Sequence, residues 1–329
     1  MRSAFARAGA GIDGISVREA PRPPAGAGQA LVRLTAATLN FRDLLFVRGQ
    51  LVRAKSPEYV PLSCAAGEVI SVGDEVTRVK PGDRVSPLFS QGWLSGPTPA
   101  MTMLGGPIDG VARQYAAFEA ESLCLIPDEI GDLEAATLPC AGLTAWTALF
   151  GARPLRPGEW VLVQGTGGVS LAALQWAKAA GANVIATSSS EAKLARARAL
   201  GADITINYRK VPDWAGAALA ALGGRGVDIV VDVVGATEID ACARVVADGG
   251  AIAAVGRLQG PDNRGAKIGK TVIPIVVGNR EQHEAMLRFC ADHGIRPVVD
   301  AVYDLDRLAD AMHLLESGRF FGKVGINLT

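Results

Sequence analysis

The spacing of hydrophobic and polar residues changes twice along the chain of 329 residues. Up to about residue 130, short apolar runs alternate with turns, and the segment GDEVTRVKPGDRV is typical of two strands joined by a Pro-Gly-Asp turn. From about residue 158 the pattern becomes strand, helix, strand, helix, which favours a parallel sheet with helices on both faces. The strands of this sheet are predicted at Trp160–Gln164, Asn183–Thr187, Asp203–Asn207, Asp228–Asp232 and Ala251–Val255.

After about residue 295 the β-rich pattern returns. The segment RPVVDAVYDL predicts a strand, Leu308, Ala311, Met312 and Leu315 follow a helical stripe, and GKVGINLT predicts a closing strand. We therefore expect an α/β protein whose first domain is discontinuous. The predicted domains are residues 1–129 with 296–329, which form a β-rich domain, and residues 130–295, which form a doubly wound dinucleotide-binding domain.

Composition narrows the possible partners. Lys plus Arg equals Asp plus Glu at 33 each, so charge gives no reason to expect nucleic acid or an anionic membrane. No apolar run approaches the roughly 18 residues that span a bilayer, and the N-terminus lacks the apolar core of a secretory signal. Five scattered cysteines are typical of reduced thiols, so we expect a cytoplasmic protein.

A glycine-rich turn lies in VLVQGTGGVS, which begins at Val161. Gly165 and Gly167 fit the first two positions of the dinucleotide fingerprint, and Ser170 stands at the third. A helix starting at Gly168 would aim its first amides at phosphate. Such a turn also occurs in other α/β proteins, but a strand before it and a second strand after the helix favour a dinucleotide site. The residues predicted to bind the cofactor here are Gly165, Thr166, Gly167, Gly168 and Val169.

The end of the next strand indicates which nicotinamide nucleotide is bound. NAD sites usually place an acidic residue there, whereas this strand ends in Thr187, Ser188 and Ser189. Hydroxyls can donate to a 2′-phosphate and Lys193 can neutralise it, so we predict NADP(H). The alternative is that the serines cap a helix and that Lys193 is an ordinary surface lysine. Glu191 is interpreted as a favourable residue at a helix start.

Five motifs together resemble the medium-chain dehydrogenase/reductase superfamily, near its zinc-free quinone oxidoreductases and alcohol-dehydrogenase-like reductases. They are LNFRDLLFVRG (39–49), AAGEVISVGDEVTRVKPGDRV (65–85), AATLPCAGLTAW (135–146), VLVQGTGGVS (161–170) and GKVGINL (322–328). The resemblance implies a GroES-like catalytic domain, a Rossmann domain inserted within it, and an active site in the cleft between them.

The zinc ligands of the zinc-binding relatives are mostly replaced in this sequence. Asn40 stands where those relatives have a cysteine, Ser63 stands at their histidine, and Cys64 stands at the following glutamate. Cys140, four residues before Thr144, matches the third ligand. Because a catalytic zinc needs three protein ligands, we predict no metal. The histidines are interpreted as surface or helix-end residues: His283, His293 and His313.

The catalytic candidates are Asn40, Thr144 and Tyr59. The Asn40 amide could donate to a substrate oxygen or to the nicotinamide ribose, and Thr144 stands where relatives contact the nicotinamide, although it could instead cap a helix. Relatives use a tyrosine as proton donor at the position of Leu51, which leaves Tyr59 as the nearest tyrosine downstream. Other residues have simpler interpretations: Arg42 and Asp43 as a local structural pair, and Trp93 as a pocket residue or a surface residue.

The resemblance implies further cofactor contacts after the later strands: Tyr208, Val233, Gly235, Gly256, Arg257, Val277 and Asn327. Lys323 is expected to neutralise phosphate or to lie solvated in its turn. The apolar run TVIPIVV is expected to be an edge strand that pairs with its twin in a homodimer.

The predicted function is therefore NADPH-dependent reduction of a small carbonyl compound, enone or quinone without zinc. Reduction of a 2-enoyl thioester, oxidation of an alcohol and a non-enzymatic NADPH-binding role stay open as alternatives.

Overall fold

The computed structural model describes residues 1–7, 9–51, 56–99, 101–256 and 268–329. These residues form two compact units, which we describe separately. The first unit comprises Met1–Leu143 and Gly278–Thr329, and the second comprises Thr144–Val277.

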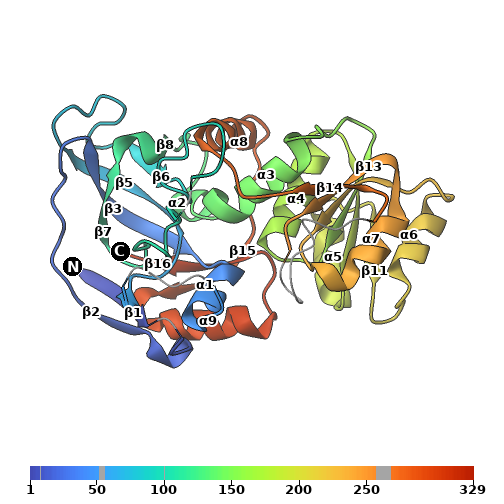
Figure 1. Ribbon diagram of the computed structural model, residues 1–329, viewed down its shortest axis with the longest axis horizontal. Coiled ribbons are helices and arrows are strands. Elements are labelled where there is room, and N and C mark those ends of the chain that lie inside the picture. The colour runs from blue at the N-terminus through green and yellow to red at the C-terminus, as the bar shows by residue number, and fades with distance from the viewer. Residues whose placement is uncertain (8, 52–55, 100, 257–267) are drawn as a thin grey trace. The chain divides into compact units, whose positions relative to one another are not determined.

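The first unit is built mainly from antiparallel strands (Figure 1). Its larger sheet has the order β15-β16-β3-β5-β6-β8 with β7 paired to β3, and a small sheet has the order β2-β1-β4. The strands are β1 (Arg2–Arg7), β2 (Ser16–Glu19), β3 (Gln29–Thr38), β4 (Glu58–Tyr59), β5 (Cys64–Val72), β6 (Arg84–Pro87), β7 (Tyr115–Glu119), β8 (Leu123–Leu125), β15 (Val299–Asp304) and β16 (Lys323–Asn327). The helices are α1 (Phe41–Val47), α2 (Asp132–Ala135), a π-helical turn (Leu138–Gly142), α8 (Arg280–Asp292) and α9 (Leu308–Ser317).

The C-terminal segment completes the core of this first unit. Strand β16 pairs with β3 through Gly325–Thr38 and its neighbours, and β15 adds to β16 in parallel. The helical stripe of α9, from Leu308 to Leu315, joins the same buried cluster as Leu34 of β3. The first compact unit is thus built from two separate stretches of the chain.

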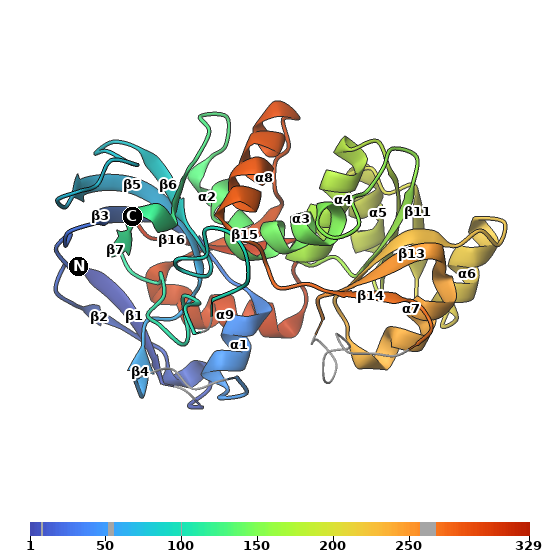
Figure 2. The same cartoon turned by 45° about the horizontal axis from the view of Figure 1, so that its top comes forward.

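The second unit is a parallel sheet in the order β11-β10-β9-β12-β13-β14. This is the doubly wound order, whose direction reverses between β9 and β12, where such folds bind nucleotides. Helices α4 and α5 lie on one face, and α6 and α7 pack together on the other (Figures 1 and 2). The strands are β9 (Trp160–Gln164), β10 (Asn183–Ser188), β11 (Ile204–Asn207), β12 (Val227–Asp232), β13 (Val246–Ala254) and β14 (Thr271–Pro274). The helices are α3 (Leu143–Phe150), α4 (Gly168–Ala179), α5 (Glu191–Ala199), α6 (Trp214–Ala221) and α7 (Ile239–Val245).

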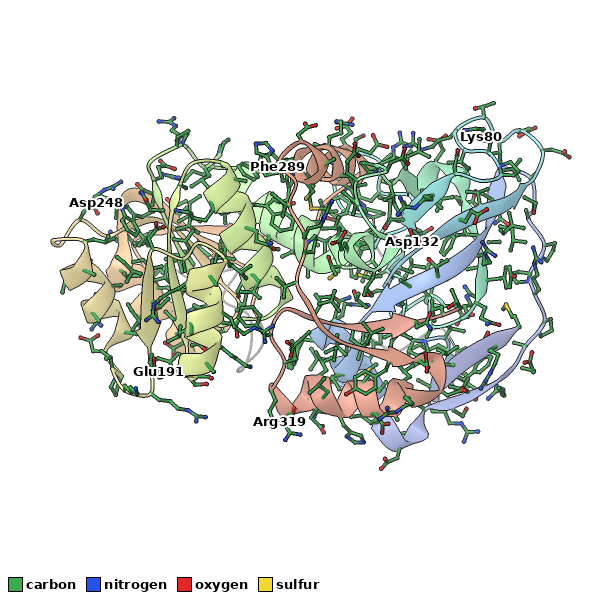
Figure 3. The ribbon with its side chains drawn as sticks, turned by 180° about the vertical axis from the view of Figure 1, so that it is seen from behind. Lys80, Asp132, Glu191, Asp248, Phe289 and Arg319 are labelled. Carbon is green, nitrogen blue, oxygen red and sulfur yellow. The ribbon has the colours of Figure 1, made fainter. Side chains whose placement is uncertain are left out.

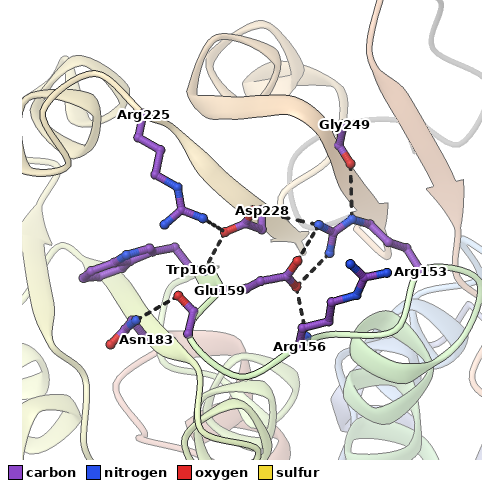
Figure 4. A network of polar contacts seen from close by, with 9 residues as sticks. Arg153, Arg156, Glu159, Trp160, Asn183, Arg225, Asp228 and Gly249 are labelled. Atoms are coloured by element: carbon purple, nitrogen blue, oxygen red, sulfur yellow. Dashed lines mark hydrogen bonds and ion pairs between the residues drawn. The ribbon is translucent and has the colours of Figure 1, made fainter.

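A network of ion pairs joins the amino ends of the central strands (Figure 4). Arg153 holds Glu159 through two bonds of 2.9 and 3.1 Å. Asp228 accepts from the Trp160 amide at 2.8 Å and from Arg225 at 2.8 Å. This edge of the sheet is therefore filled by its own side chains, which leaves the carboxyl edge for a ligand.

The limits of the compact units differ from the expected domains. Residues 130–143 and 278–295, which we expected in the dinucleotide-binding domain, lie in the first unit. Helix α8 is fastened there because Arg280 pairs with Glu121 and Arg78 pairs with Glu284. A helical pattern shows that a helix forms but not which sheet it packs on, so the limits of these compact units could not be derived from the pattern.

Within the part of the chain that the structure describes, no helix is both long enough and apolar enough to cross a bilayer.

Candidate functional site

The glycine turn, residues 165–170, follows β9 at the carboxyl edge of the sheet. Gly165 has φ +74°, a left-handed conformation that favours glycine. Gly167 caps the N-terminus of α4. A Cβ atom added at either glycine would meet nothing within 4 Å, so the backbone faces open space on the side where a cofactor would lie. The turn thus fits a pyrophosphate, which would meet the first amides of α4.

Ser170 takes the third position of the fingerprint without disrupting the turn. Its side chain is 1 % exposed, and its hydroxyl donates to the Gln164 carbonyl at 2.7 Å. This bond ties α4 to the end of β9, where a glycine would permit close helix–strand packing. The serine therefore joins the helix to the strand by a hydrogen bond, where a glycine would do so by close packing.

The end of β10 presents hydroxyl groups beside this turn. The Gly165 amide donates to the Thr187 hydroxyl at 3.4 Å, which joins the two strand ends. Ser188 is 4 % exposed and accepts from the Ser190 amide, whereas Ser189 is half-buried. Ser190 is the N-cap of α5 and accepts from the Lys193 amide at 3.4 Å. The capping alternative therefore applies to Ser190, not to Ser189.

Glu191 is held by its neighbours on β11 and the turn after it. Its carboxylate accepts from the Asn207 amide group at 2.7 Å and pairs with Lys210 at 3.0 Å. These bonds lower the pKa of Glu191, so it stays ionised but partly neutralised. Tyr208, on the same turn, is 42 % exposed and lies next to these residues in sequence.

The loop after β12 is shaped by a residue that the sequence did not single out. Asp232 is fully buried, and one of its oxygens accepts from the Val234 and Gly235 amides at 3.0 Å each. Gly256 lies so close to Val233 that a Cβ atom would come within 2.2 Å of its carbonyl carbon. The predicted contacts Val233, Gly235 and Gly256 thus belong to one tightly built edge, whereas Arg257 lies outside the described residues.

Val277 stands out in its backbone. It has φ +36° although it is β-branched, and it is 9 % exposed. Such conformations are costly and concentrate at functional sites. Val277 thus combines a strained backbone with burial, and its contact with the cofactor stays a prediction.

In the first unit, side chains from four separate segments form a buried polar cluster: Asn40, Ser63, Cys64, Cys140 and Lys323. Lys323 begins β16 and is 5 % exposed. Its ammonium donates to the Leu39 carbonyl and, at 2.6 Å, to Asn40 Oδ1. This engagement corrects our expectation for Lys323, because its charge neither lies in solvent nor is free for a phosphate.

The lysine fixes the orientation of the Asn40 carboxamide. With Oδ1 turned to Lys323, Asn40 Nδ2 donates to Ser63 Oγ at 3.2 Å and to Cys64 Sγ at 3.1 Å. Asn40 is also the N-cap of α1, and its backbone amide donates to the Asp43 carboxylate at 2.7 Å. Both ends of the side chain are thus occupied within the cluster, and Asn40 is 7 % exposed.

The two cysteines of the cluster influence each other's ionisation. Burial opposes ionisation of Cys64, but hydrogen bonds from Cys140 and Asn40 and the charge of Lys323 together lower the pKa of this thiol to about 7. The hydrogen bond to Cys64 and burial raise the pKa of the Cys140 thiol. Burial in turn lowers the pKa of Lys323, and the thiols oppose that change. The Cys64 thiol and the buried ammonium therefore favour each other's charged form.

Arg42 and Asp43 have structural roles beside the cluster. Arg42 donates to the Leu104 and Gly106 carbonyls at 2.9 and 2.7 Å, which anchors the loop that follows β6. Asp43 is 2 % exposed and lies 3.7 Å from Arg42, and burial raises its pKa. Tyr59 is 3 % exposed and its hydroxyl has no hydrogen-bond partner, while burial and the Asp43 charge raise its pKa. A buried phenol of this kind is poorly suited to donate a proton to substrate.

The cluster does not fit a catalytic zinc. Its donors are two thiols, a carboxamide and a hydroxyl, and an ammonium group occupies the place beside them. Zinc in proteins takes thiolate, imidazole or carboxylate ligands. Elsewhere in the described ranges, no group of three or more His, Cys, Asp or Glu side chains is arranged to hold a metal ion.

The remaining predicted residues lie in different surroundings. Thr144 is 4 % exposed in α3. Asn327 ends β16, where it donates to Asp304 at 3.2 Å and lines a surface cavity of about 440 Å³ rather than the polar cluster. Trp93 is 7 % exposed and donates to the Gly96 carbonyl, so it is neither a surface residue nor free.

One histidine corrects our sequence interpretation. His283 is fully buried in α8 and neither ring nitrogen has a hydrogen-bond partner, whereas His293 and His313 are exposed. The helical spacing His283, Met286, Leu287, Cys290 was the signal that could have placed it on the buried face.

Comparison with known proteins matches both halves of the sequence. Residues 26–128 match the family model described as alcohol dehydrogenase GroES-like domain, and residues 168–292 match the one described as zinc-binding dehydrogenase. A zinc-type alcohol dehydrogenase-like protein of Schizosaccharomyces pombe is 39 % identical, over 92 % of this chain and 91 % of its own. An acryloyl-coenzyme A reductase of Metallosphaera sedula is 29 % identical, over 94 % of this chain and 96 % of its own.

Structural comparison agrees with these matches. A crystal structure described as an NAD-dependent alcohol dehydrogenase superposes with a TM-score of 0.91 at 32 % identity, and all of each chain is covered. The fold and the site thus define a nicotinamide-dependent oxidoreductase with a GroES-like part and a Rossmann-type part. The chain belongs to the medium-chain dehydrogenase/reductase superfamily.

Proposed function

We propose that the chain is a reductase that uses NADPH, without zinc, to transfer hydride to a small carbonyl compound, an enone or a quinone. The observation that carries this proposal is the end of β10. Hydroxyl groups and Lys193 lie there in place of an acidic residue, and Glu191 is tied to Asn207 and Lys210. A 2′-phosphate would meet donors and positive charge at this strand end, whereas an NAD ribose would lack its usual carboxylate.

Each part of the glycine turn has a role toward the cofactor in this proposal. Gly165, Thr166, Gly167, Gly168 and Val169 would hold the pyrophosphate through backbone amides. Ser188, Ser189, Lys193 and Tyr208 would surround the adenosine ribose phosphate, and Thr144, Val233, Gly235, Gly256 and Val277 would contact the nicotinamide half. When bound, NADPH supplies the hydride.

In the polar cluster, we assign Asn40 an orienting role instead of direct donation to substrate. Lys323 and the Cys64 thiol hold its carboxamide at both ends, so Asn40 fixes the charge and the hydrogen bonds of the cluster. Cys140 is the partly exposed member of the set, whereas Ser63 and Cys64 are fully buried. Because these donors do not make up a zinc site, we propose that the enzyme works without zinc.

A second candidate is the reduction of a 2-enoyl thioester. The similarity to an acryloyl-coenzyme A reductase favours it. Enoyl thioesters and enones both present a carbon–carbon double bond conjugated to a carbonyl, so the same hydride transfer could serve either class. Crotonyl-coenzyme A tested beside simple enones at the same concentration separates the two candidates. Turnover of the thioester alone would move the proposal to this second class.

The first test is a fluorescence titration of chelator-treated protein with NADPH and with NADH. One structural neighbour is described as NAD-dependent, so the choice of nucleotide is the point to decide. We expect NADPH to bind at least about tenfold more tightly, which corresponds to one additional charge-assisted contact. A preference for NADH would overturn the assignment of Ser188, Ser189 and Lys193, and failure to bind either nucleotide would overturn the reductase itself.

We also propose a homodimer formed through β14. This strand ends the sheet order, and Val276 just after it is 41 % exposed. An edge strand with unpaired backbone groups favours pairing with a second copy. Light scattering after size-exclusion chromatography tests this, and a Val272→Lys variant should shift the mass toward that of the monomer.

A further inference from the structure

The second unit carries an acidic residue close to the strand end where NAD sites place one. Glu191 (labelled in Figure 3) begins α5, three residues after Ser188 ends β10. Its side chain is 52 % exposed, and its pKa is lowered, so it is negatively charged at neutral pH. A carboxylate at this strand end would accept hydrogen bonds from an NAD ribose and would repel a 2′-phosphate. The direction in which Glu191 points therefore affects which nucleotide fits.

Asn207 holds this carboxylate on the side of β11. Asn207 Nδ2 donates to Glu191 Oε1 at 2.7 Å, and Lys210 Nζ lies 3.0 Å from the same oxygen. Asn207 ends β11 and pairs with Ser188, so the two strand ends lie level at the carboxyl edge of the sheet. Asn207 is 9 % exposed, whereas the Lys210 side chain is 67 % exposed and screened by solvent. The bond from Asn207 is thus the firmer of the two.

The orientation of the Asn207 carboxamide is fixed by its own turn. Its Oδ1 accepts from the Arg209 amide at 3.1 Å. Its backbone carbonyl accepts from the Lys210 and Val211 amides at 3.0 and 2.8 Å. An asparagine that bonds the backbone two residues further on stabilises a turn of this kind. Because the oxygen already has its donor, the amide nitrogen points to Glu191 and the carboxamide cannot turn round without losing both bonds.

We propose that Asn207 determines the nucleotide specificity, because it holds Glu191 away from the ribose and leaves the end of β10 open to a 2′-phosphate. The inference rests on the proposed use of NADPH and deepens it, since it identifies the residue that restrains the opposing carboxylate. Asn207 is a positioning residue that acts through Glu191. Without it, only an exposed lysine would restrain Glu191, and the carboxylate could turn toward the ribose.

The test is a double-mutant cycle of Asn207→Ala and Glu191→Gln, read as the ratio of NADPH affinity to NADH affinity. Fluorescence titration gives both dissociation constants for wild type, each single variant and the double variant. Asn207→Ala should lower NADPH affinity about tenfold, because the released carboxylate would lie near the phosphate charge. NADH affinity should stay unchanged or rise, since a ribose hydroxyl can donate to the carboxylate. Glu191→Gln alone should change the ratio by no more than about twofold, since this carboxylate is already held away.

The double variant separates specificity from structure. With no carboxylate left to release, Asn207→Ala in the Glu191→Gln background should return the ratio to within about twofold of wild type. If Asn207 only stabilised the turn after β11, its loss would weaken both nucleotides alike, and Glu191→Gln would not repair the loss.

Two further variants control for changes in the fold. Asn207→Ser keeps an oxygen for the Arg209 amide without adding charge, but its side chain is too short to hold Glu191, so the ratio should fall as in Asn207→Ala. Asn183→Ala is the matched control. Asn183 begins β10, at the other end of the strand, where it donates to the Gly158 carbonyl at 3.2 Å, and its loss should leave the ratio unchanged.

The results distinguish this inference from the proposed function. If wild type prefers NADPH and Asn207→Ala leaves the ratio unchanged, or if its effect persists undiminished in the double variant, the role of Asn207 is overturned and the use of NADPH stands. Equal weakening of both nucleotides by Asn207→Ala also overturns the specificity role alone. A wild-type preference for NADH overturns the proposed use of NADPH, and this inference with it.

Discussion

The glycine turn of the second unit and the polar cluster of the first unit differ in how the chain builds them. The turn comes from six consecutive residues that follow β9 and include the start of α4, so its conformation is set locally. The cluster joins side chains at positions 40, 63, 64, 140 and 323, which come together only when β16 pairs with β3 and β3 with β5. A local motif can be identified from sequence, whereas a cluster of distant residues depends on the complete fold.

The glycine turn and the polar cluster also differ in the interactions that stabilise them. Small residues and open space characterise the turn, where added Cβ atoms at Gly165 and Gly167 would meet nothing. Buried charge and mutual hydrogen bonds characterise the cluster, where Lys323 has both of its acceptors inside the protein. Substitutions in the cluster should therefore act mainly on stability, and substitutions beside the turn mainly on cofactor binding.

The largest effect is expected for Lys323→Ala. The change leaves the Leu39 carbonyl and Asn40 Oδ1 buried without a donor and opens a cavity, so the free energy of unfolding should fall by about 3–4 kcal/mol. Urea denaturation of the holoprotein and of the free protein measures it. Lys80→Ala is the matched control: Lys80 is a surface lysine whose side chain is 80 % exposed (Figure 3), and its loss should cost less than about 1 kcal/mol. Equal losses in the two variants would contradict the cluster's role in holding the first unit.

The next largest effect is the dependence of folding stability on pH. It should arise in the first unit, since all three histidines lie there. Burial lowers the pKa of His283 from 6.5 to about 4. Between these values the unfolded chain binds the proton and the folded chain does not, so this contribution is complete above pH 6.5 and is lost as the pH falls toward 4. The loss should reach about 3 kcal/mol.

Urea denaturation of wild type and of His283→Leu over this pH range tests the assignment. The variant should show a flatter pH dependence than wild type, and exposed His313→Leu should leave the wild-type slope intact. If both variants retain the full slope, another group titrates.

A smaller effect, on binding alone, is expected for Lys193→Glu beside the glycine turn. The substitution removes one positive charge near the proposed 2′-phosphate and adds a negative one, so NADPH affinity should fall by about a hundredfold and NADH affinity by much less. Lys178→Glu, on α4 where Lys178 pairs with Asp203, is the control and should leave both affinities nearly unchanged. Equal weakening of NADPH and NADH by Lys193→Glu would remove the phosphate assignment, whatever the stability results show.

The comparison also explains which features could be predicted from sequence. The parallel strands and the turn follow from periodicity and local glycine chemistry, and β9 spans the predicted residues Trp160–Gln164. The motifs led to the prediction that Asn40 and Ser63 stand in place of zinc ligands. The place of Lys323 could not be predicted, because a lysine in a strand is usually exposed and its partners lie more than 280 residues earlier. The burial of His283 and the packing of α8 in the first unit were not predicted for a related reason: helical spacing shows a buried face but not the surface that buries it.

The smallest effect is expected in the glycine turn itself, for the substitution Ser170→Gly. This change makes the turn match the dinucleotide fingerprint. If Ser170 is only a poorer substitute for glycine, the variant should bind the cofactor as well as wild type or better, and it should be no less stable. The structure predicts a loss of folding stability instead, because the Ser170 hydroxyl donates to the Gln164 carbonyl at 2.7 Å and the residue is 1 % exposed. Loss of that bond, together with the lower helix propensity of glycine, should reduce the free energy of unfolding by about 1–2 kcal/mol. Ser170→Ala loses the same bond without the helix-propensity penalty of glycine, so it should destabilise the fold less, by about 1 kcal/mol at most. If both variants are as stable as wild type, the turn is held by backbone geometry alone, and the serine is a passive substitute for glycine.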